Sequence, residues 1–283
     1  MMKSLFQAYI RLDQYLAASP LLRSSFRNRN RNSVKTVFFP GCSLAAYNPD
    51  YVLKIRDFIS GKFGECEVFM ACCAKPLKLM GIEHVFNKRI DAVRRGLDSI
   101  NAETVITACQ NCFKILRKYD TGRNIISLWP LVYEVGLPDG CEGRYSGMHA
   151  SIQDSCAMND FPEVAEAVRK ILKRLGVAVH EMKVSGCKAK CCGGIAMLKT
   201  GDVKLGRDCM MRRADESPCE IIVSYCASCR SAMAVNNAHK SLHLADLIWG
   251  SGEPCASSLS SSFINNIVNR YRAARININI KEI

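Results

Sequence analysis

The chain has 283 residues, of which 48% are apolar and 16 are cysteine, and its formal net charge is +13. This length is enough for two domains of ordinary size, so a mini-protein that depends on disulfide bonds is excluded. No stretch approaches ~18 unbroken apolar residues and the N-terminus lacks a continuous apolar segment, so we expect neither a membrane span nor a secreted protein. We predict a cytoplasmic protein whose clustered thiols stay reduced and either bind metal or take part in redox chemistry.

The first expected element is a basic, amphipathic N-terminal extension over residues 1–34. Its apolar residues share roughly one face of a helix, namely Met2, Leu5, Phe6, Tyr9, Leu12 and Leu16. Seven basic residues against Asp13 alone (7 − 1) give residues 1–35 a net charge of +6.

Residues 35–138 alternate short apolar runs with helical patterns. We predict strands at residues 37–39, 68–70, 105–107 and 125–128. Between them, apolar spacing predicts helices over 51–59 and 85–100 and a helix that starts near residue 113. Strands that alternate with helices indicate parallel α/β units, in which ligands gather at the carboxyl ends of the strands.

A second region of the same kind covers residues 145–250, after a small, polar linker over 139–147. Here we predict a helix over 164–175 and strands at 177–180 and 221–224. Residues 251–283 form a basic C-terminal helix and tail. Four basic residues against Glu282 (4 − 1) give residues 262–283 a net charge of +3, and Phe263, Ile264, Ile267, Val268 and Tyr271 share one helical face.

The basic charge of the chain is therefore concentrated in its two terminal segments. We interpret them as docking to an acidic partner or to an anionic lipid surface on the inner face of a membrane, and not as a nucleic-acid footprint. The simpler alternative is that the basic residues are only solvated. Amphipathic faces of this kind also pack on their own protein more often than on a membrane or a partner.

The cysteines show that the chain is an internal duplication. Cys42 and Cys156 each follow an apolar run, the adjacent pairs are 72–73 and 191–192, and the C-x2-C pairs are 109/112 and 226/229. Matched landmarks, including the similar segments 127–136 and 243–250, are separated by 114 to 119 residues. We therefore predict an α/β fold that is a tandem duplication of a small, mainly parallel, cysteine-rich domain, with the two copies related by a pseudo-two-fold axis.

Each repeat offers five thiols as metal ligands. The first repeat reads C-x29-CC-x35-C-x2-C and the second C-x34-CC-x33-C-x2-C. A C-x2-C pair that opens a helix can place two thiolates on one centre, because a helix N-terminus favours the thiolate. Sets of thiolates select zinc, copper(I) or iron–sulfur. Five cysteines exceed the four that structural zinc requires, so iron–sulfur is favoured over zinc and over disulfides or inert core thiols.

The remaining six cysteines do not repeat, and we expect them to be buried or incidental thiols: Cys66, Cys141, Cys187, Cys209, Cys219 and Cys255. Cys187 is the one of these six that could have a role at the second cysteine set, because it lies four residues before Cys191.

The two blocks of CC and C-x2-C, over about residues 36–250, resemble the cysteine-rich CCG domain found in a subunit of heterodisulfide reductase. The resemblance implies two non-cubane 4Fe–4S clusters. It assigns Cys42, Cys72, Cys73, Cys109 and Cys112 to one cluster, and Cys156, Cys191, Cys192, Cys226 and Cys229 to the other. It further implies that a small disulfide is reduced between the clusters, with electrons from a ferredoxin-like or flavoprotein partner. Two departures concern the substrate pocket: Ala74 replaces a Gly, and Gln153 stands where many relatives have His.

Two other functions stay open on the sequence: an electron-transfer subunit linked to a membrane quinone pool, and a non-catalytic iron–sulfur scaffold or sensor. Lys183, Lys188 and Lys190 flank the second cysteine set and are either candidate contacts for an anionic substrate or plain surface residues. No histidine is a convincing catalyst, since His149 lies on an expected strand and His243 in an apolar run. The sequence has no G-x-G-x-x-G and no ferredoxin-type cysteine run, which is why electrons are expected from a partner.

Overall fold

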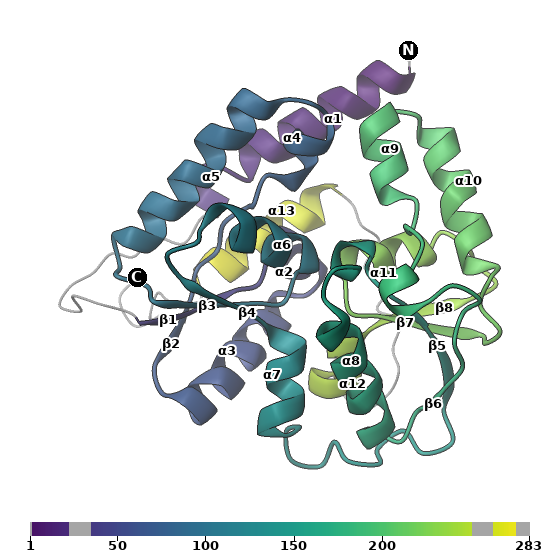
Figure 1. The fold of residues 1–283 in the computed structure, drawn as a ribbon. Helices are drawn as coiled ribbons and strands as arrows, with labels where there is room; N and C mark the ends of the chain where they lie inside the picture. The colour runs from purple at the N-terminus through teal and green to yellow at the C-terminus, as the bar shows by residue number, and fades with distance from the viewer. Residues whose placement is uncertain (1, 23–34, 251–262, 276–283) are drawn as a thin grey trace. The chain divides into compact units, whose positions relative to one another are not determined.

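A computed structural model describes residues 2–22, 35–250 and 263–275, and its described part divides into two compact units (Figure 1). We call them the first-repeat unit (Ala8–Ile126 and Leu259–Ile283) and the second-repeat unit (Met1–Gln7 and Ser127–Ser258). Cys255 and the basic segments 23–34 and 276–283 lie outside the described residues. Residues 127–138 were expected in the first repeat, whereas packing groups them with the second.

The first-repeat unit is built on a four-stranded sheet with the order β2-β1-β3-β4. Its strands are β1 (Thr36–Phe39), β2 (Cys66–Val68), β3 (Thr104–Thr107) and β4 (Asn124–Ser127). The central strand β1 pairs in parallel with both β2 and β3, so that Thr36 lies opposite Cys66 and Thr104. Val37, Phe38 and Phe39 are fully buried, as expected for a strand that is covered on both faces.

Helices connect these strands, and two terminal helices belong mainly to the same unit. They are α2 (Cys42–Tyr47), α3 (Pro49–Phe63), α4 (Lys75–Leu79), α5 (Glu83–Asp98), α6 (Gln110–Tyr119), α1 (Met2–Leu16), the 3-10 turn η1 (Pro20–Leu22) and α13 (Phe263–Ala274). Local sequence sets their ends: Asn48 caps α3 by accepting from the Asp50 amide, and Gly64, with a φ of 83°, ends it.

The second-repeat unit repeats the same sheet with the order β6-β5-β7-β8. Its strands are β5 (His149–Gln153), β6 (Ala178–Val179), β7 (Ile221–Ser224) and β8 (Lys240–His243), and all pairings are parallel. Its helical elements are α7 (Leu128–Val135), η2 (Cys156–Met158), α8 (Pro162–Arg174), η3 (Gly186–Lys188), α9 (Gly194–Thr200), α10 (Val203–Ala214), α11 (Ala227–Met233) and α12 (Leu244–Trp249).

The matching order of strands confirms the α/β tandem duplication, since each strand of one sheet has its counterpart in the same place of the other. The predicted pseudo-two-fold axis stays a prediction. Most expected elements are confirmed within one or two residues. The strand expected at 68–70 lies two residues earlier, because β2 ends at Val68 and the chain continues as a buried loop to the cysteine pair. The helix expected over 51–59 extends to Phe63, and the helix expected to start near residue 113 begins at Gln110.

Helix α7 follows β4 in the chain but packs against α8 in the second-repeat unit (Figure 1). Buried Trp129 on α7 contacts His243 and Trp249, with ring centroids 5.9 and 6.4 Å away. The segment that follows α7 also contacts α12, because the buried Cys141 thiol donates a hydrogen bond to the Ile248 carbonyl at 3.4 Å. This aromatic contact explains why packing places residues 127–138 with the second repeat.

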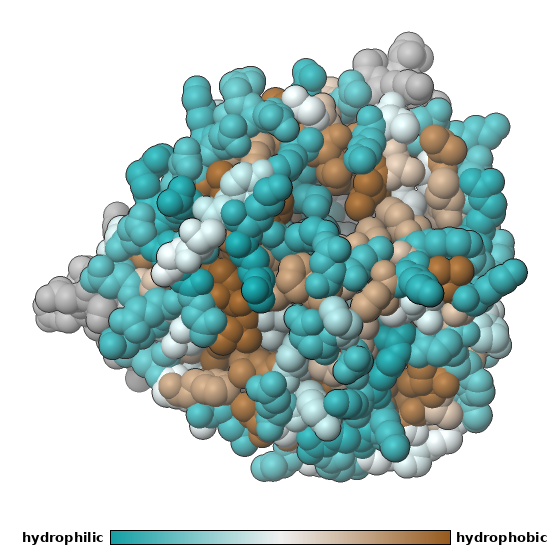
Figure 2. Space-filling model, viewed as in Figure 1, coloured by the Kyte–Doolittle hydropathy of each residue, from teal (hydrophilic) through white to brown (hydrophobic). Residues whose placement is uncertain are grey.

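Among the described helices, none is both long and apolar enough to cross a membrane. On the face drawn in Figure 2, polar side chains predominate and apolar residues form patches between them.

Candidate metal centres

The five motif cysteines of the first repeat gather at the carboxyl ends of its strands. Cys42 is the first residue of α2 and directly follows Pro40 and Gly41. Cys109 is the N-cap residue of α6 and lies shortly after the end of β3. Cys112 lies in the first turn of α6, which confirms the expectation that the C-x2-C pair opens a helix. The adjacent Cys72 and Cys73 end the buried loop after β2.

Contacts between sulfur atoms join Cys42 to Cys72, and Cys73 to Cys112 and Cys109, and the adjacency of Cys72 and Cys73 unites the five side chains in one group, which we call the first centre. The Sγ atoms of Cys72 and Cys42 are 3.8 Å apart. Cys112 is hydrogen-bonded to Cys109 and to Cys73, and these bonds, with burial, raise its pKa well above the ordinary value. The hydrogen bond from Cys72, followed by the charge of Arg270, lowers the pKa of Cys42 to about 6 although burial opposes it. Within this group, Cys42 is therefore the thiol whose surroundings favour the thiolate, which is the form that binds a thiophilic ligand.

The turn before Cys42 packs tightly on the opposite pair of cysteines. A Cβ atom on Gly41 would lie 2.6 Å from Cys109 Cβ and 3.2 Å from Cys112 Sγ, and Gly41 has a φ of 77°. Only glycine allows this approach, because any side chain would displace the C-x2-C pair.

Two buried polar atoms close in sequence to Cys109 have no hydrogen-bond partner among the described residues. The hydroxyl of Thr107, at the end of β3, is fully buried and has no hydrogen-bond partner. The Oε1 atom of Gln110, which follows Cys109 in the chain, is also buried without a partner. A buried hydroxyl without a partner carries a desolvation cost that a bound group can remove. A sulfur-rich cofactor is such a group, so these residues fit an iron–sulfur cluster.

Two residues at this centre were missed by sequence reasoning, and both come from the terminal helices. Gln14 on α1 is buried, and its Oε1 atom accepts a hydrogen bond from Cys72 Sγ at 3.5 Å. Arg270 on α13 donates through Nε to the Cys42 carbonyl at 3.3 Å and through Nη1 to Asp13 Oδ1 at 2.7 Å. The amphipathic pattern predicted both helices, but it gave no signal that a polar residue on them would reach the cysteines.

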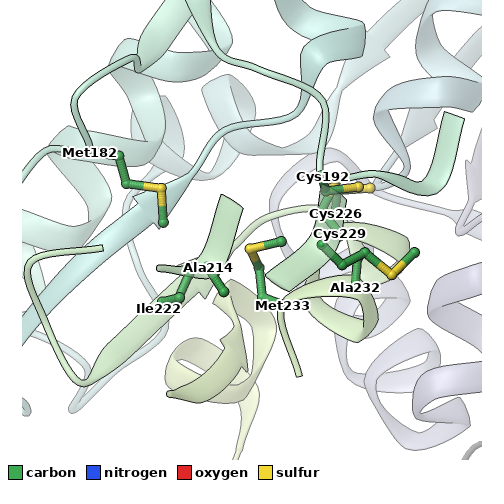
Figure 3. Packing of buried hydrophobic residues seen from close by; sticks show 9 residues of the cluster. Met182, Cys192, Ala214, Ile222, Cys226, Cys229, Ala232 and Met233 are labelled. Carbon is green, nitrogen blue, oxygen red and sulfur yellow. The ribbon is translucent and has the colours of Figure 1, made fainter. Parts of the chain in front are cut away.

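The second repeat forms a second centre from the equivalent elements. Cys156 begins η2 after β5, Cys226 caps α11 after β7, and Cys229 lies in the first turn of α11. Figure 3 shows Cys192, Cys226 and Cys229 close together at one end of a buried cluster that continues through Met233 toward Ile222.

The sulfur contacts of the second centre follow the same order as those of the first. Cys156 is hydrogen-bonded to Cys191, Cys191 to Cys192, Cys192 to Cys229, and Cys229 to Cys226. The bond with Cys229, and then backbone amides at the start of α11, lower the pKa of Cys226 to about 7 against the effect of burial. Backbone amides that follow each CC pair also reach sulfur, as from Ala74 to Cys72 and from Gly194 to Cys192.

A buried ion pair stands beside the second centre. Asp154, two residues before Cys156, is fully buried and accepts two hydrogen bonds from Arg169, at 3.1 and 2.8 Å. Its oxygens also accept from the Tyr225 hydroxyl at 3.1 Å and the Gly186 amide at 2.7 Å. Asp154 therefore joins β5, α8 and the loop that leads to Cys191.

A second polar network holds the same loop from its other side. The buried Arg213 donates to Gln153 Oε1 at 2.7 Å and to the Val184 carbonyl at 2.9 Å. Glu216 bridges Arg213 and Lys190, at 2.5 and 2.8 Å. Gln153, which departs from the family pattern, thus serves as a structural acceptor here. Lys190, a candidate substrate contact, forms an ion pair with Glu216, and it is exposed, as are Lys183 and Lys188.

Among the described residues, the cysteines and histidines outside the two motif sets have other surroundings. Cys187 is exposed, and burial raises the pKa of Cys66 on β2 to about 12. His243 is buried and caps α12 by accepting from the Ala245 amide, as a satisfied core imidazole does. His149 and His180 are hydrogen-bonded at 2.8 Å and line an open cavity of about 550 Å³ at the start of β5, the end opposite the cysteines.

In the part of the chain that the structure describes, no three His, Cys, Asp or Glu side chains converge on a single point as ligands of one metal ion do. The sulfurs of each centre instead form a series of neighbouring contacts. Five thiols, all buried or half-buried, are a donor set that fits an iron–sulfur cluster, which is held by cysteine thiolates.

Comparison with known protein families finds a match. A model of the family described as "Cysteine-rich domain" (CCG) matches the chain twice, at residues 36–117 and 150–234. Together these two segments cover more than half of the 283 residues and contain all ten motif cysteines. No curated protein matches the chain.

Proposed function

The chain belongs to the cysteine-rich domain family, which indicates iron–sulfur electron transfer, and on that premise we propose that its ten motif cysteines hold two clusters. The first centre and the second centre each take one cluster. Following the resemblance to the CCG-domain subunit of heterodisulfide reductase, the clusters are of the non-cubane 4Fe–4S type. The chain is then the disulfide-reducing module of a larger complex.

The observation that carries this proposal is the shared order of sulfur contacts. In both repeats the lone cysteine meets the first member of the CC pair, and the second member meets the last cysteine of C-x2-C. Two cysteine sets that were only structural would be free to diverge after duplication. Complete sets in the same arrangement support a cofactor at each centre.

When bound, an iron–sulfur cluster supplies electrons one at a time, so two clusters match the two electrons that a disulfide takes. The overall reaction consumes one disulfide, two electrons and two protons and yields two thiols. The electrons come from a ferredoxin-like or flavoprotein partner. Lys183 and Lys188, exposed beside the second centre, attract an anionic disulfide.

A second candidate function is that of a subunit that transfers electrons to membrane quinone. Exposed apolar residues on the terminal helices favour it. Ile264, Val268 and Tyr271 form one stripe along α13 with exposures of 70, 49 and 45%. Leu12 and Tyr15 on α1 are exposed in the same unit. Exposed apolar residues on basic helices are typical of proteins that lie on an anionic lipid surface.

Iron analysis tests the clusters. Protein purified without oxygen should contain about eight irons per chain if each cluster has four. Cys109→Ser and Cys226→Ser should each remove about half of the iron, because each breaks one centre. The matched control is Cys187→Ser, which changes an exposed thiol close to the second centre and should leave the iron content unchanged. Stoichiometric zinc without iron would refute the proposal.

Oxidation of the reduced protein separates the two functions. The chain is reduced with a low-potential dye and then offered small disulfides and quinones separately. Oxidation by a disulfide that is lost in Cys73→Ser and in Cys192→Ser supports disulfide reduction. Rapid oxidation by quinone alone supports the second candidate. Inertness to both, with full iron content, leaves a scaffold or sensor.

Binding to vesicles tests the lipid surface. The double variant Ile264→Ser/Val268→Ser should bind vesicles that contain phosphatidylglycerol more weakly, and binding should fall as salt rises. Leu53→Ser, which changes an exposed apolar residue on α3 of the same unit, is the control. Equal binding of all three proteins would count against the quinone-linked function.

A further inference from the structure

The sheet of the second-repeat unit carries a pair of histidines at its amino end, opposite the motif cysteines. His149 is the first residue of β5, and His180 directly follows β6. The His180 amide donates to the Ala150 carbonyl at 2.9 Å, which holds His180 beside β5. The Nδ1 atom of His149 and the Nε2 atom of His180 lie 2.8 Å apart, so the two imidazole rings face each other from neighbouring strands.

The spacing of these nitrogens suits two ligands of one metal ion. Tetrahedral zinc binds imidazole nitrogens at about 2.0–2.1 Å, which places two such nitrogens about 3.3 Å from each other. The facing nitrogens therefore need to separate by only about 0.5 Å, and to turn toward a common point, for an ion to replace the hydrogen-bonding proton between them. Both side chains are exposed, so this adjustment displaces no core residue.

The surroundings of the pair suit a cation. His149 and His180 line a cavity of about 550 Å³ together with Cys219 and Glu220. Among the described residues that line this cavity, Glu220 is the only Asp, Glu, Lys or Arg, so no basic side chain of the lining repels a cation. Imidazole nitrogen, thiolate sulfur and carboxylate oxygen are the three kinds of donor that zinc accepts in proteins.

The segment before β7 is fixed where it borders the cavity. The Cys219 carbonyl accepts from the Ser217 hydroxyl at 2.8 Å and lies 3.0 Å from His239 Nδ1, and the Cys219 amide donates to Ser217 Oγ at 3.2 Å. Three metal-binding side chains do not converge on one point in the described part of the chain. The two histidines are therefore the preformed ligands, and water or a turned side chain of Cys219 or Glu220 fills the other positions.

The first repeat has different residues at the matching positions. The registers of the two sheets align His149 with Lys35 and His180 with Glu67. Lys35 instead forms an ion pair with Glu103, at 3.3 Å between two exposed side chains. The shared fold therefore does not require histidines here, and the facing pair is a feature of the second repeat.

We propose that His149 and His180 bind a zinc ion at the amino end of this sheet. The ion ties the two-residue edge strand β6 to the central strand β5. Because it binds the folded unit and bridges two of its strands, it stabilises the second-repeat unit as its concentration rises. The site is separate from the two cysteine centres, and the inference goes beyond the proposed function, since no motif cysteine takes part.

Zinc titration of the full chain, purified without oxygen and with its iron present, tests the site. By isothermal titration calorimetry the parent should bind about one zinc ion per chain at the histidine pair, with its iron content unchanged. His149→Asn and His180→Asn should each weaken this binding about tenfold or more. The matched control is His84→Asn, which changes an exposed histidine on α5 of the first-repeat unit and should bind zinc as the parent does.

The outcome that would overturn the inference is a parent that binds no zinc, or zinc binding that is equal in the parent and in both variants. Comparison with the variants isolates the zinc that depends on the histidines, even in a chain whose motif cysteines hold zinc instead of iron. Failure of this inference is thus distinguishable from failure of the proposed function, which the iron content shows.

Unfolding by denaturant provides a second readout, followed by the fluorescence of Trp129 and Trp249 in the second-repeat unit. Zinc chloride should raise the denaturant midpoint of the parent, whereas magnesium chloride should not, because magnesium prefers oxygen ligands. The rise should be lost in His149→Asn and in His180→Asn. Each protein is compared with itself with and without zinc, so a general loss of stability does not imitate loss of the site. A rise of the same size in all three proteins would contradict the proposal.

Discussion

Ala74 and Gly193 occupy the same position after the two CC pairs, and both have a left-handed backbone, with φ angles of 56° and 97°. This conformation turns the chain into α4 and α9 and directs backbone amides toward the sulfurs of the pair. The left-handed backbone therefore explains why the family motif has a glycine at this position. The alanine of the first repeat adopts the same conformation at some cost in strain.

The two positions should respond differently to exchange of glycine and alanine. A Cβ on Gly193 would lie 2.8 Å from the Gly206 carbonyl oxygen and 2.9 Å from the Met210 amide nitrogen. Gly193→Ala should therefore lower the free energy of unfolding by about 2–4 kcal/mol, from strain and overpacking together. Ala74→Gly should change it by less than about 1 kcal/mol, because relief of strain is offset by greater freedom of the unfolded chain.

Denaturant titration of the reduced protein measures both effects. Tryptophan fluorescence reports the second-repeat unit, since Trp129 and Trp249, the only tryptophans of the chain, both lie in it. Circular dichroism reports the whole chain. A Gly193→Ala protein as stable as the parent would contradict the tight packing of Gly193 on α10.

Gly41→Ala should disrupt the first centre alone. The added Cβ would stand 2.6 Å from Cys109 Cβ, so the C-x2-C pair must move and about half of the iron should be lost. Gly61→Ala is the control, because this glycine on α3 has open space around its Cβ and should gain ~0.5–1 kcal/mol of helix stability. Full iron content in Gly41→Ala would contradict this prediction, because the backbone at position 41 would then have shifted without displacing the cysteines.

His243 should make the second-repeat unit sensitive to acid. Burial, and then the charge of Arg230, lower its pKa to about 3, so the folded protein holds it neutral while the unfolded chain protonates it below its ordinary pKa of 6.5. Unfolded chains then bind more protons as the pH falls, which costs about 1.4 kcal/mol of stability between about pH 7.5 and about pH 5.5.

His243→Asn should remove this dependence while it preserves the cap of α12, because asparagine is a strong N-cap residue. The measurement is the denaturant midpoint by tryptophan fluorescence at the two pH values, for parent and variant. The same loss of stability in both proteins would assign the acid sensitivity to other groups.

Asp154→Asn should weaken the second-repeat unit and its hold on iron. Removing the charge of the fully buried Asp154 leaves Glu181 as the carboxylate partner of Arg169, and we expect a loss of about 2–4 kcal/mol of stability. Glu181→Gln breaks the more exposed half of the same network and should cost less than about 1 kcal/mol. Unfolding by tryptophan fluorescence and iron content of the second centre are the readouts; equal effects of the two variants would contradict the role of burial.

Several features of this protein follow from sequence patterns alone. Duplication was visible because the ten motif cysteines recur at nearly constant separation, and the alternating strands and helices because apolar residues recur at local periods. That each C-x2-C pair lies at the turn that opens a helix was also expected, and Cys109 and Cys226 are the N-cap residues of α6 and α11, although α6 begins three residues before the expected start near residue 113. These are local properties, set by residues that lie close together in the chain.

Tertiary structure alone decided which distant residues complete each centre. Arg270 meets Asp13 across 257 positions of sequence, and Trp129 on α7 packs beside Trp249 on α12. Such contacts depend on burial and on the fit of side chains from separate elements, which no local period encodes. The sequence therefore determined the motif cysteines and their order, whereas the folded chain decided which charges surround them.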